Sequence, residues 1–550
     1  MPFPSRGCKT CKQRRVKCDE VHPVCNRCQK AKLVCHRVEE TGGFVFLDEN
    51  KYAVGRLKRP RGPNVNAGTA TQIESVPGHQ HATSQAPLPE AQNFAILPLL
   101  GIPLDEQALT YYSRHYVEAP EALSGIMDGH LQCALIHGCY SQPQSILSLA
   151  IFAVSHATYG RARRSPAALS TGYTKYSKAL LKTNLALKDA TQSTNDDVLL
   201  AVMLLSYYEN SVMDKKSSTL SRGILAMASR SFAHHDGAIA LLNVRRQLEQ
   251  RENKSIHLDM LVRRQLLRSV LLRSMPLPPW LFDGSQYGER GFALEFDHCA
   301  ARAATLRHQA STISVDATSP SKDRHVRKLH DLLAKAQALD DDLITWANSL
   351  PPEDRYNTHV VQSDIVPGPG SMIFESTVHV YATVSHAGMW NRYRATRLAV
   401  NEVILKTLSV LQASDFEMNS LKEAAKSRTT ALANDLCASV PFMLGLIELQ
   451  HVAGQDVALI KTPPFLKFVV KASTASFLCW PLAMAAMMSG ISCEQHYYLR
   501  SRLRDVSEIV DDGVLEVIAE GSPKTSHGRA NTLGPIIVPA CQYSAGAQAR

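Results

Sequence analysis

The feature that most constrains this chain is a repeated pattern of cysteines near its N-terminus. Six of the thirteen cysteines lie within residues 8–35, in the stretch CKTCKQRRVKCDEVHPVCNRCQKAKLVC. The spacing C-x2-C-x6-C occurs twice, so each cysteine of the first half has a counterpart seventeen residues later. The six are Cys8, Cys11, Cys18, Cys25, Cys28 and Cys35. This internal repeat predicts a small unit with pseudo-twofold symmetry.

Paired C-x2-C motifs favour zinc, which takes four ligands in a tetrahedron. Two zinc ions need eight ligations, so two of the six sulfurs must bridge, and symmetry makes the bridging sulfurs one of the three matched pairs. A disulfide framework and a single structural zinc site are the alternatives. Disulfide-rich domains are typical of secreted proteins, whereas we expect no signal peptide here. A RING-type site would need a histidine ligand and wider gaps. We therefore expect two zinc ions per chain, and we expect the other seven cysteines to be reduced.

The positive charge of the chain is concentrated around this repeat. Residues 1–62 carry fifteen Lys or Arg against six Asp or Glu, whereas residues 63–550 carry forty-five against forty-four. A local excess of this sign attracts polyanions such as nucleic acid. The length of 550 residues predicts at least one further folded unit.

Basic side chains are more numerous in the first half of the repeat than in the second. The first half contains Lys9, Lys12, Arg14, Arg15 and Lys17. The second offers Arg27, Lys30 and Lys32. This asymmetry indicates that a short helix after the second cysteine enters the major groove of DNA, where Arg and Lys donate to guanine O6 and N7. The alternative is a solvated face that keeps a small domain soluble.

The six-cysteine stretch resembles the fungal binuclear zinc cluster (Zn2Cys6) DNA-binding domain, and Pro23 matches the loop proline of that family. The resemblance implies two short helices and two zinc ions bridged by Cys8 and Cys25. It implies that the first zinc is completed by Cys11 and Cys18, and the second by Cys28 and Cys35. It also implies recognition of a CGG-type half-site, with Arg14 and Arg15 at base edges and Lys9, Lys12 and Lys17 nearer phosphates.

A linker is expected over residues 38–94, because this stretch is basic at first and then rich in Pro, Gly, Ser and Thr. Sustained apolar heptads are missing and Gly42, Gly43 and Gly55 interrupt the stretch, so we do not expect a coiled coil directly after the cluster. The candidate nuclear import signal is Arg56, Lys58, Arg59 and Arg61. The alternative for these residues is an ordinary charged linker.

The large remainder, residues 95–520, is predicted to be an all-α domain, followed by a disordered tail over 521–550. Apolar residues recur at three and four positions in 145–161, 173–189 and 195–210, with Asn195 as an N-cap. Alternating strand patterns are missing. The apolar window 472–493 is interpreted as a buried pair of helices, because it contains several Ser, Thr and Pro residues.

Four stretches of this remainder, 234–245, 389–398, 433–445 and 477–485, resemble the fungal-specific transcription factor domain. That resemblance implies a regulatory role in activation, dimerisation or inhibition. Glu209 and Asp435 are candidates for lining a ligand pocket, against the alternative of paired core residues. Trp390, Arg392, Tyr393 and Arg394 are candidates for a cation–π cluster or a partner surface, against the alternative of ordinary core packing.

The sequence predicts a nuclear, zinc-dependent regulator of transcription by RNA polymerase II that binds double-stranded DNA at specific sites. We expect an activator of a fungal secondary-metabolic gene cluster that contacts the transcription machinery, with homodimers or heterodimers formed through the helical domain and no membrane association. The alternative is a metabolite-sensing regulator, either an activator or a repressor, whose helical domain binds a small ligand and thereby controls DNA binding. Catalytic motifs such as the P-loop, HExxH and GxSxG are missing, so no enzymatic activity is expected.

Overall fold

The computed structural model describes most of the chain after residue 100 and the core of the cysteine repeat. The described residues are 8, 10–11, 14, 16–21, 23–35, 101–117, 142–213, 228–248, 252–313, 322–361, 366–411, 416–452, 455–461, 466–488 and 490–520. Contacts divide the chain into two compact units, Met1–Ile96 and Leu97–Arg550. The linker 38–94, its basic residues Arg56, Lys58, Arg59 and Arg61, and the tail 521–550 lie outside the described residues.

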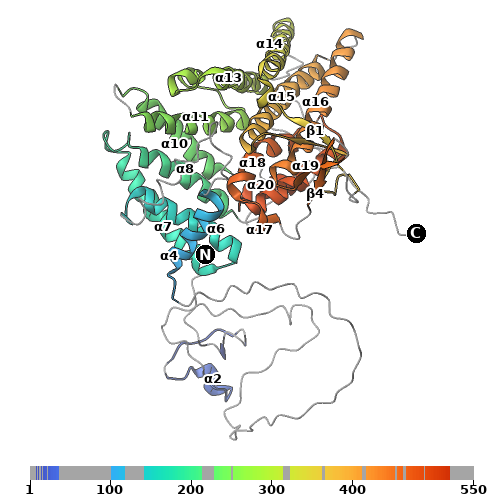
Figure 1. Cartoon of the computed structure of the whole chain (residues 1–550). Helices are drawn as coiled ribbons and strands as arrows, with labels where there is room; N and C mark the ends of the chain where they lie inside the picture. Colours follow the sequence, from blue (N-terminus) through green and yellow to red (C-terminus); the bar gives the residue numbers. More distant parts are fainter. Residues whose placement is uncertain are drawn as a thin grey trace, which may run out of the picture. The chain divides into compact units, whose positions relative to one another are not determined.

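The first helices of the larger unit form a stack that can be followed in Figure 1. These elements are α4 (Leu104–Tyr112), the π-helical η1 (Ser113–Val117), α6 (Ile146–Arg163), α7 (Pro166–Ala186), α8 (Asp196–Ser211), α10 (Ser229–Arg245) and α11 (Asn253–Arg273). Helix α6 packs against α4, α7 and α8, and the stack continues from α8 through α10 to α11.

Local signals explain where these helices begin. Ser145 accepts a hydrogen bond from the backbone N–H of Ser148 at the start of α6, and Ser165 caps α7, whose first residue is proline. The predicted cap Asn195 accepts from the N–H of Asp197 at 2.9 Å. The three helices expected within 142–213 are therefore confirmed.

The later helices surround α15, which is buried on most of its surface. The elements are α12 (Pro279–Phe282), the 3-10 turn η4 (Gly284–Tyr287), α13 (Gly291–Thr312), α14 (Lys322–Ser349), the 3-10 turn η5 (Pro352–Asp354), α15 (Val384–Val410), α16 (Phe416–Met443), α17 (Leu466–Val469), α18 (Ala472–Ala486), α19 (Cys493–Ile509) and α20 (Gly513–Glu520). Helices α13, α14, α16 and α18 all contact α15. This group contains the largest apolar core.

The predicted cation–π cluster lies inside this core. The guanidinium of Arg394 lies 4.8 Å from the ring centroid of Tyr356 and 5.8 Å from that of Trp390. It also donates to the hydroxyl of Tyr381 at 2.6 Å. Arg392 lies on another side of α15, 5.1 Å from the ring centroid of Phe296. Arg394 and Trp390 therefore form a cation–π cluster that packs within the fold, whereas Arg392 is not part of it.

Two short hairpins correct the all-α prediction, although the larger unit is mostly helical. Strand β1 (Asn357–Val360) pairs antiparallel with β2 (Thr377–Val380), and β3 (Ile447–Val452) pairs antiparallel with β4 (Gln455–Ile460). Each strand has four to six residues, so only two or three residues lie on each face, and the alternating pattern is a weak signal in the sequence.

The window 472–493 also differs from its prediction. It forms one helix, α18, followed by a connection to α19, and it does not form two helices. Pro481 lies inside α18, so the helix continues through a proline at this position. Cys493 at the end of this window is disulfide-bonded, against the expectation of a reduced thiol. Within the described segments, no helix combines the length and the apolar character needed to cross a membrane.

The C-terminal helices return to the first helices of the unit. The turn between α19 and α20 contributes Asp512, which accepts from the side-chain amide of Asn210 at 3.1 Å. The hydroxyl of Tyr207 donates to the carbonyl of Val510 in the same turn. The end of the larger unit therefore packs against its earlier helices, with α20 in contact with α8.

Candidate metal centre

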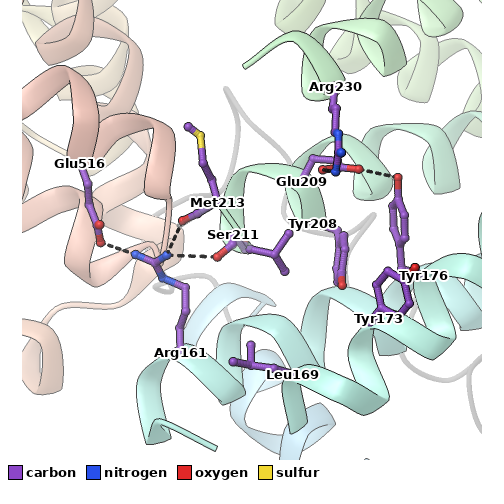
Figure 2. Close-up of a pocket in the computed structure, with 11 residues that line it drawn as sticks. Arg161, Leu169, Tyr173, Tyr176, Tyr208, Glu209, Ser211, Met213, Arg230 and Glu516 are labelled. Atoms are coloured by element: carbon purple, nitrogen blue, oxygen red, sulfur yellow. Dashed lines mark hydrogen bonds and ion pairs between the residues drawn. The ribbon is translucent and has the colours of Figure 1, made fainter. Parts of the chain in front are cut away.

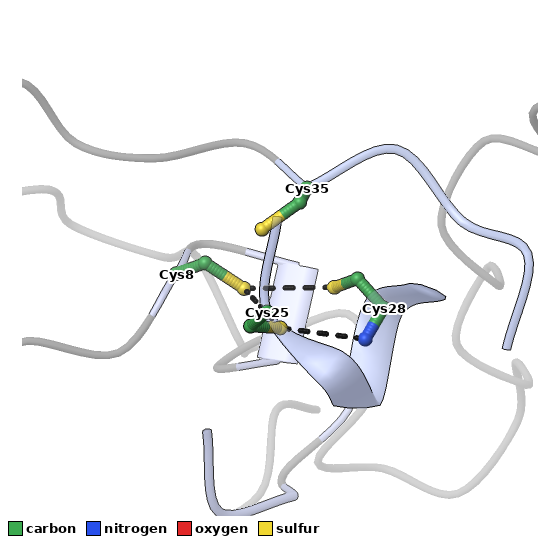
Figure 3. A group of neighbouring side chains, drawn as sticks. All are labelled: Cys8, Cys25, Cys28 and Cys35. Carbon is green, nitrogen blue, oxygen red and sulfur yellow. Dashed lines mark hydrogen bonds between the residues drawn. The ribbon is translucent and has the colours of Figure 1, made fainter. Parts of the chain in front are cut away.

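The sulfurs of the cysteine repeat converge on one small region of the N-terminal unit. Figure 3 shows four of them pointing toward one another. The Sγ atom of Cys8 lies 3.8 Å from that of Cys25 and 3.6 Å from that of Cys28. Cys11 Sγ lies 3.6 Å from Cys25 Sγ. Zinc–sulfur bonds of roughly 2.3 Å at tetrahedral angles place two ligand sulfurs about 3.8 Å apart. The spacing therefore fits sulfurs that share a zinc ion.

The six sulfurs fall into two groups of four, and within each group all sulfurs lie within 4.8 Å of one another. One group contains Cys8, Cys11, Cys18 and Cys25. The other contains Cys8, Cys25, Cys28 and Cys35. Cys8 and Cys25 belong to both groups and form one of the three matched pairs of the repeat. The distance between the Sγ atoms of Cys11 and Cys28 is also 3.8 Å, so a single distance does not identify the bridging pair. The two groups favour Cys8 and Cys25 as the bridging pair, because only these two cysteines belong to both groups.

Backbone hydrogen bonds recur at equivalent positions of the two halves. The N–H of Cys11 donates to Cys8 Sγ at 3.4 Å, and the N–H of Cys28 donates to Cys25 Sγ at 3.3 Å. In the same way, the N–H of residue 16 donates to the carbonyl of residue 11, and that of residue 33 to the carbonyl of residue 28. The two sulfurs that receive these N–H groups are the two that both groups share.

The electrostatics of the thiols is set first by burial. Burial raises the pKa of Cys11 and raises that of Cys28 to about 12. Burial opposes ionisation of Cys25 too, but hydrogen bonds donated by the backbone of Cys28 and by neighbouring thiols leave its pKa below the ordinary value. Two buried thiols that resist ionisation need a nearby cation to become thiolates at neutral pH.

Two residues that the sequence analysis did not single out hold the centre together. Thr10 is buried, and its hydroxyl donates to the carbonyl of Val34 at 2.6 Å, which links the first half of the repeat to the end of the second. Asp19 accepts from the backbone N–H of Asn26 at 3.1 Å, at the first turn of helix α2 (Asn26–Lys30). An acidic residue placed before a short helix is a signal that could have identified Asp19.

The structure places some of the predicted DNA-contacting residues. Arg14 and Lys17 are both exposed, and the N–H of Arg14 donates to the carbonyl of Thr10 at 3.2 Å, as in a helical turn. In the second half, Arg27 and Lys30 are exposed on α2. Lys9, Lys12 and Arg15 lie outside the described residues.

The comparisons with known proteins agree with this geometry. Residues 6–41 match the fungal Zn(2)-Cys(6) binuclear cluster domain. Domains of this family hold two zinc ions through six clustered cysteines, so the chain has an N-terminal zinc cluster domain that binds two zinc ions. The prediction of zinc as the cofactor is confirmed.

Two curated relatives, both from Candida albicans, match the same region. The chain is 62% identical over 34 residues to the protein named sterol uptake control protein 2, and 55% identical over 31 residues to the one named adhesion and hyphal regulator 1. Each match covers 6% of this chain and 5% of the relative. No solved structure matches the chain significantly. The similarity therefore concerns the cysteine repeat.

Proposed function

We propose that this protein is a zinc-dependent, sequence-specific DNA-binding regulator of transcription by RNA polymerase II. The observation that carries the proposal is the pair of four-sulfur groups beside exposed basic residues, in a region that matches a binuclear zinc cluster domain. The names of the two relatives, a control protein and a regulator, agree with it. The proposal places the protein in the nucleus and gives it no catalytic activity.

In this proposal, Cys8 and Cys25 bridge the two zinc ions, because they are the sulfurs common to both groups. Cys11 and Cys18 complete the first site, and the remaining two cysteines complete the second. Zinc supplies a structural cross-link, and such links contribute on the order of 10 kcal/mol to the folding of small metal domains. The cluster therefore fixes the backbone that presents the basic residues.

The first half of the repeat is proposed to enter the major groove. Arg14 and Arg15 would donate to guanine O6 and N7 and select a CGG-type half-site, whereas Lys9, Lys12 and Lys17 would contact phosphates. The exposure of Arg14 and Lys17 supports this assignment. One triplet is too short for useful specificity, so we propose that two copies, or a copy and a related partner, bind paired half-sites.

The helical unit is proposed to be a fungal-specific transcription factor domain with a regulatory role. Its four resembling stretches and its mostly helical fold support this assignment. We further propose that it mediates dimerisation, that the protein activates a fungal metabolic gene cluster, and that the basic run in the linker directs nuclear import.

The test is selection of bound sequences from random DNA by the zinc-loaded, full-length protein. We expect enrichment of paired CGG-like triplets, and loss of enrichment in both Cys11→Ser and the Arg14→Ala/Arg15→Ala double variant. The Arg27→Ala/Lys30→Ala double variant is the matched control, because these exposed residues lie in the second half. It should retain the same consensus. Failure of the wild type to enrich any sequence while holding two zinc ions would overturn the proposal.

A further inference from the structure

A pocket of about 620 Å³ opens in the larger unit and is lined by residues of α6, α7, α8, α10 and α20. This volume is in the range of small-molecule sites, which are mostly apolar with a few placed polar groups. Leu169 and Tyr173 of α7 line it and are exposed, and Val212 and Met213 line it after the end of α8. Glu209, one of the two candidates for lining a ligand pocket, is part of its wall, whereas Asp435 is not.

One side of the pocket is aromatic. Tyr176 and Tyr208 are stacked, with ring centroids 4.3 Å apart and planes inclined by 14°. Figure 2 shows both rings close to Tyr173 and below the carboxylate of Glu209. Aromatic faces carry a negative potential that attracts cations and flat ring systems.

The opposite side is a closed polar link. Arg161 donates to the carbonyls of Ser211 and Met213, at 3.2 and 3.4 Å, and forms an ion pair with Glu516 of α20. These interactions satisfy the carbonyls at the end of α8 and neutralise both charges. This side therefore offers a ligand little unbalanced charge.

Glu209 is different, because the residues that the structure describes balance its charge only partly. One carboxylate oxygen accepts from the hydroxyl of Tyr176 at 2.6 Å. The other lies 3.9 Å from a guanidinium nitrogen of Arg230, whose side chain is 82% exposed, whereas the side chain of Glu209 is 11% exposed. An ion pair at this distance with a solvated partner is weak. One oxygen of a nearly buried carboxylate thus keeps capacity for a donor from the pocket.

From these features, we propose that the pocket binds a small organic cation with an aromatic ring, with its ammonium group on Glu209 and its ring against the tyrosines. An ammonium group would replace the loosely held guanidinium of Arg230 and would also gain attraction from the aromatic faces. An anionic ligand of the same shape would be repelled by the carboxylate of Glu209, with no favourable interaction to offset this repulsion. The site lies within the larger unit and its test uses no DNA, so it can fail independently of the proposed function.

The probes are tyramine and tryptamine, compared with indole-3-propionate, which replaces the ammonium of tryptamine by a carboxylate. Binding to the zinc-loaded, full-length protein is measured by isothermal titration calorimetry. We expect at least one amine to saturate the protein, at least tenfold more tightly than the carboxylate. The amine should also raise the midpoint temperature of thermal unfolding, followed by tryptophan fluorescence, because it binds only the folded unit.

Glu209→Gln should weaken amine binding at least tenfold while retaining an oxygen that accepts from Tyr176. Its matched control is Glu423→Gln, an exposed carboxylate on α16 that should leave binding unchanged. Tyr173→Ala should weaken binding without a risk to the fold, since its side chain is exposed, and Leu181→Ala on the same helix is its control. Absence of saturable binding by both amines, or equal affinity in Glu209→Gln and the wild type, would overturn the proposal.

Discussion

The hydroxyl of Tyr116 donates a hydrogen bond of 2.8 Å to Oδ2 of Asp511, which lies 395 residues further along the chain. Tyr111 donates to the same oxygen at 3.3 Å. Asp511 occupies the turn before α20 with a φ of 52°, a conformation that Asn, Asp and Gly adopt more readily than other residues. The carboxylate thus joins α4 and η1 to the turn that precedes α20.

Replacing Asp511 by Ala should lower the free energy of unfolding by about 2–4 kcal/mol, because the buried hydroxyl of Tyr116 loses its acceptor and the turn becomes strained. Urea unfolding followed by tryptophan fluorescence measures this, since all four tryptophans lie in the larger unit. Asp511→Gly can adopt the positive φ of this turn but lacks the oxygen that accepts from Tyr116. Asp511→Asn can adopt this φ and also retains a side-chain oxygen as the acceptor. If all three variants unfold at the same urea concentration as the wild type, the hydrogen bond does not join the two ends.

Removing zinc should abolish DNA binding and leave the larger unit folded. The sulfurs belong to the unit Met1–Ile96, and Cys11 and Cys28 remain protonated without a cation. A strong chelator, or Cys11→Ser, is expected to remove DNA binding. The free energy of unfolding of the larger unit, followed by tryptophan fluorescence, should change by less than about 0.5 kcal/mol. Cys299→Ala, which changes a buried thiol of α13, should keep two zinc ions. A parallel loss of tryptophan-monitored stability on chelation would contradict the separation of the two units.

Acid should destabilise the larger unit through buried histidines. Burial, assisted by the charge of Arg273, lowers the pKa of His235 to about 4, from an ordinary value of 6.5. Its two ring nitrogens lie 3.0 and 2.8 Å from the hydroxyls of Ser206 and Ser269. Between pH 6.5 and 4 the unfolded state binds a proton that the folded state does not, so stability falls as the pH falls through this window.

The expected contribution of one such histidine is up to about 1.4 kcal/mol per pH unit. Urea midpoints of the wild type and of His235→Gln, measured from pH 7 to 4, should show a shallower dependence in the variant. His451→Gln, at an exposed position of β3, is the control and should follow the wild type. Identical pH dependences in all three proteins would show that His235 does not contribute.

Local patterns made the cysteine centre and the first helices predictable, whereas contacts between distant segments were not. The ligand spacing of the cysteines is written within 28 residues, and the cap of α8 lies next to the helix that it begins. In contrast, Asp340 is buried against Arg397, 57 residues away, with hydrogen bonds of 2.7 and 2.9 Å. No local pattern in the sequence identifies the partner of such a residue. The pairing of β1 with β2 is equally hard to predict from local sequence, because a long connection joins the two strands.

A cluster of three arginines, of which Arg264 is buried and the other two are partly exposed, predicts a stabilising substitution. Arg264, Arg268 and Arg392 line one small recess, and Arg264 is paired with Glu289 through two hydrogen bonds. Among the described residues, neither of the other two arginines has a carboxylate within ion-pair distance. Burial and the neighbouring guanidiniums lower the pKa of Arg268 to about 9. Arg268→Met should therefore raise the free energy of unfolding by about 1–2 kcal/mol, because it removes a desolvated and repelled charge.

The matched variant is Arg264→Met, which leaves the buried carboxylate of Glu289 without its partner. It should lower the free energy of unfolding by about 3–5 kcal/mol. The two variants remove the same charge from neighbouring turns of α11, so opposite signs in urea unfolding would isolate the effect of pairing. A loss of stability in Arg268→Met would show that its aliphatic packing and its bond to Gln265 outweigh the repulsion.

The asymmetry of the basic residues predicts a difference in the salt dependence of DNA binding. Each phosphate contact releases about one counterion, so loss of one contact reduces the slope of log K against log salt concentration by about 1. Lys17→Ala should show this reduction on a DNA containing the selected sites, and also on an unrelated DNA, because phosphate contacts are independent of sequence. Lys30→Ala, an exposed lysine of α2, should leave the slope unchanged. Equal reductions in both variants would mean that the two halves of the repeat contact DNA alike, and that the first half is not the one presented to the groove.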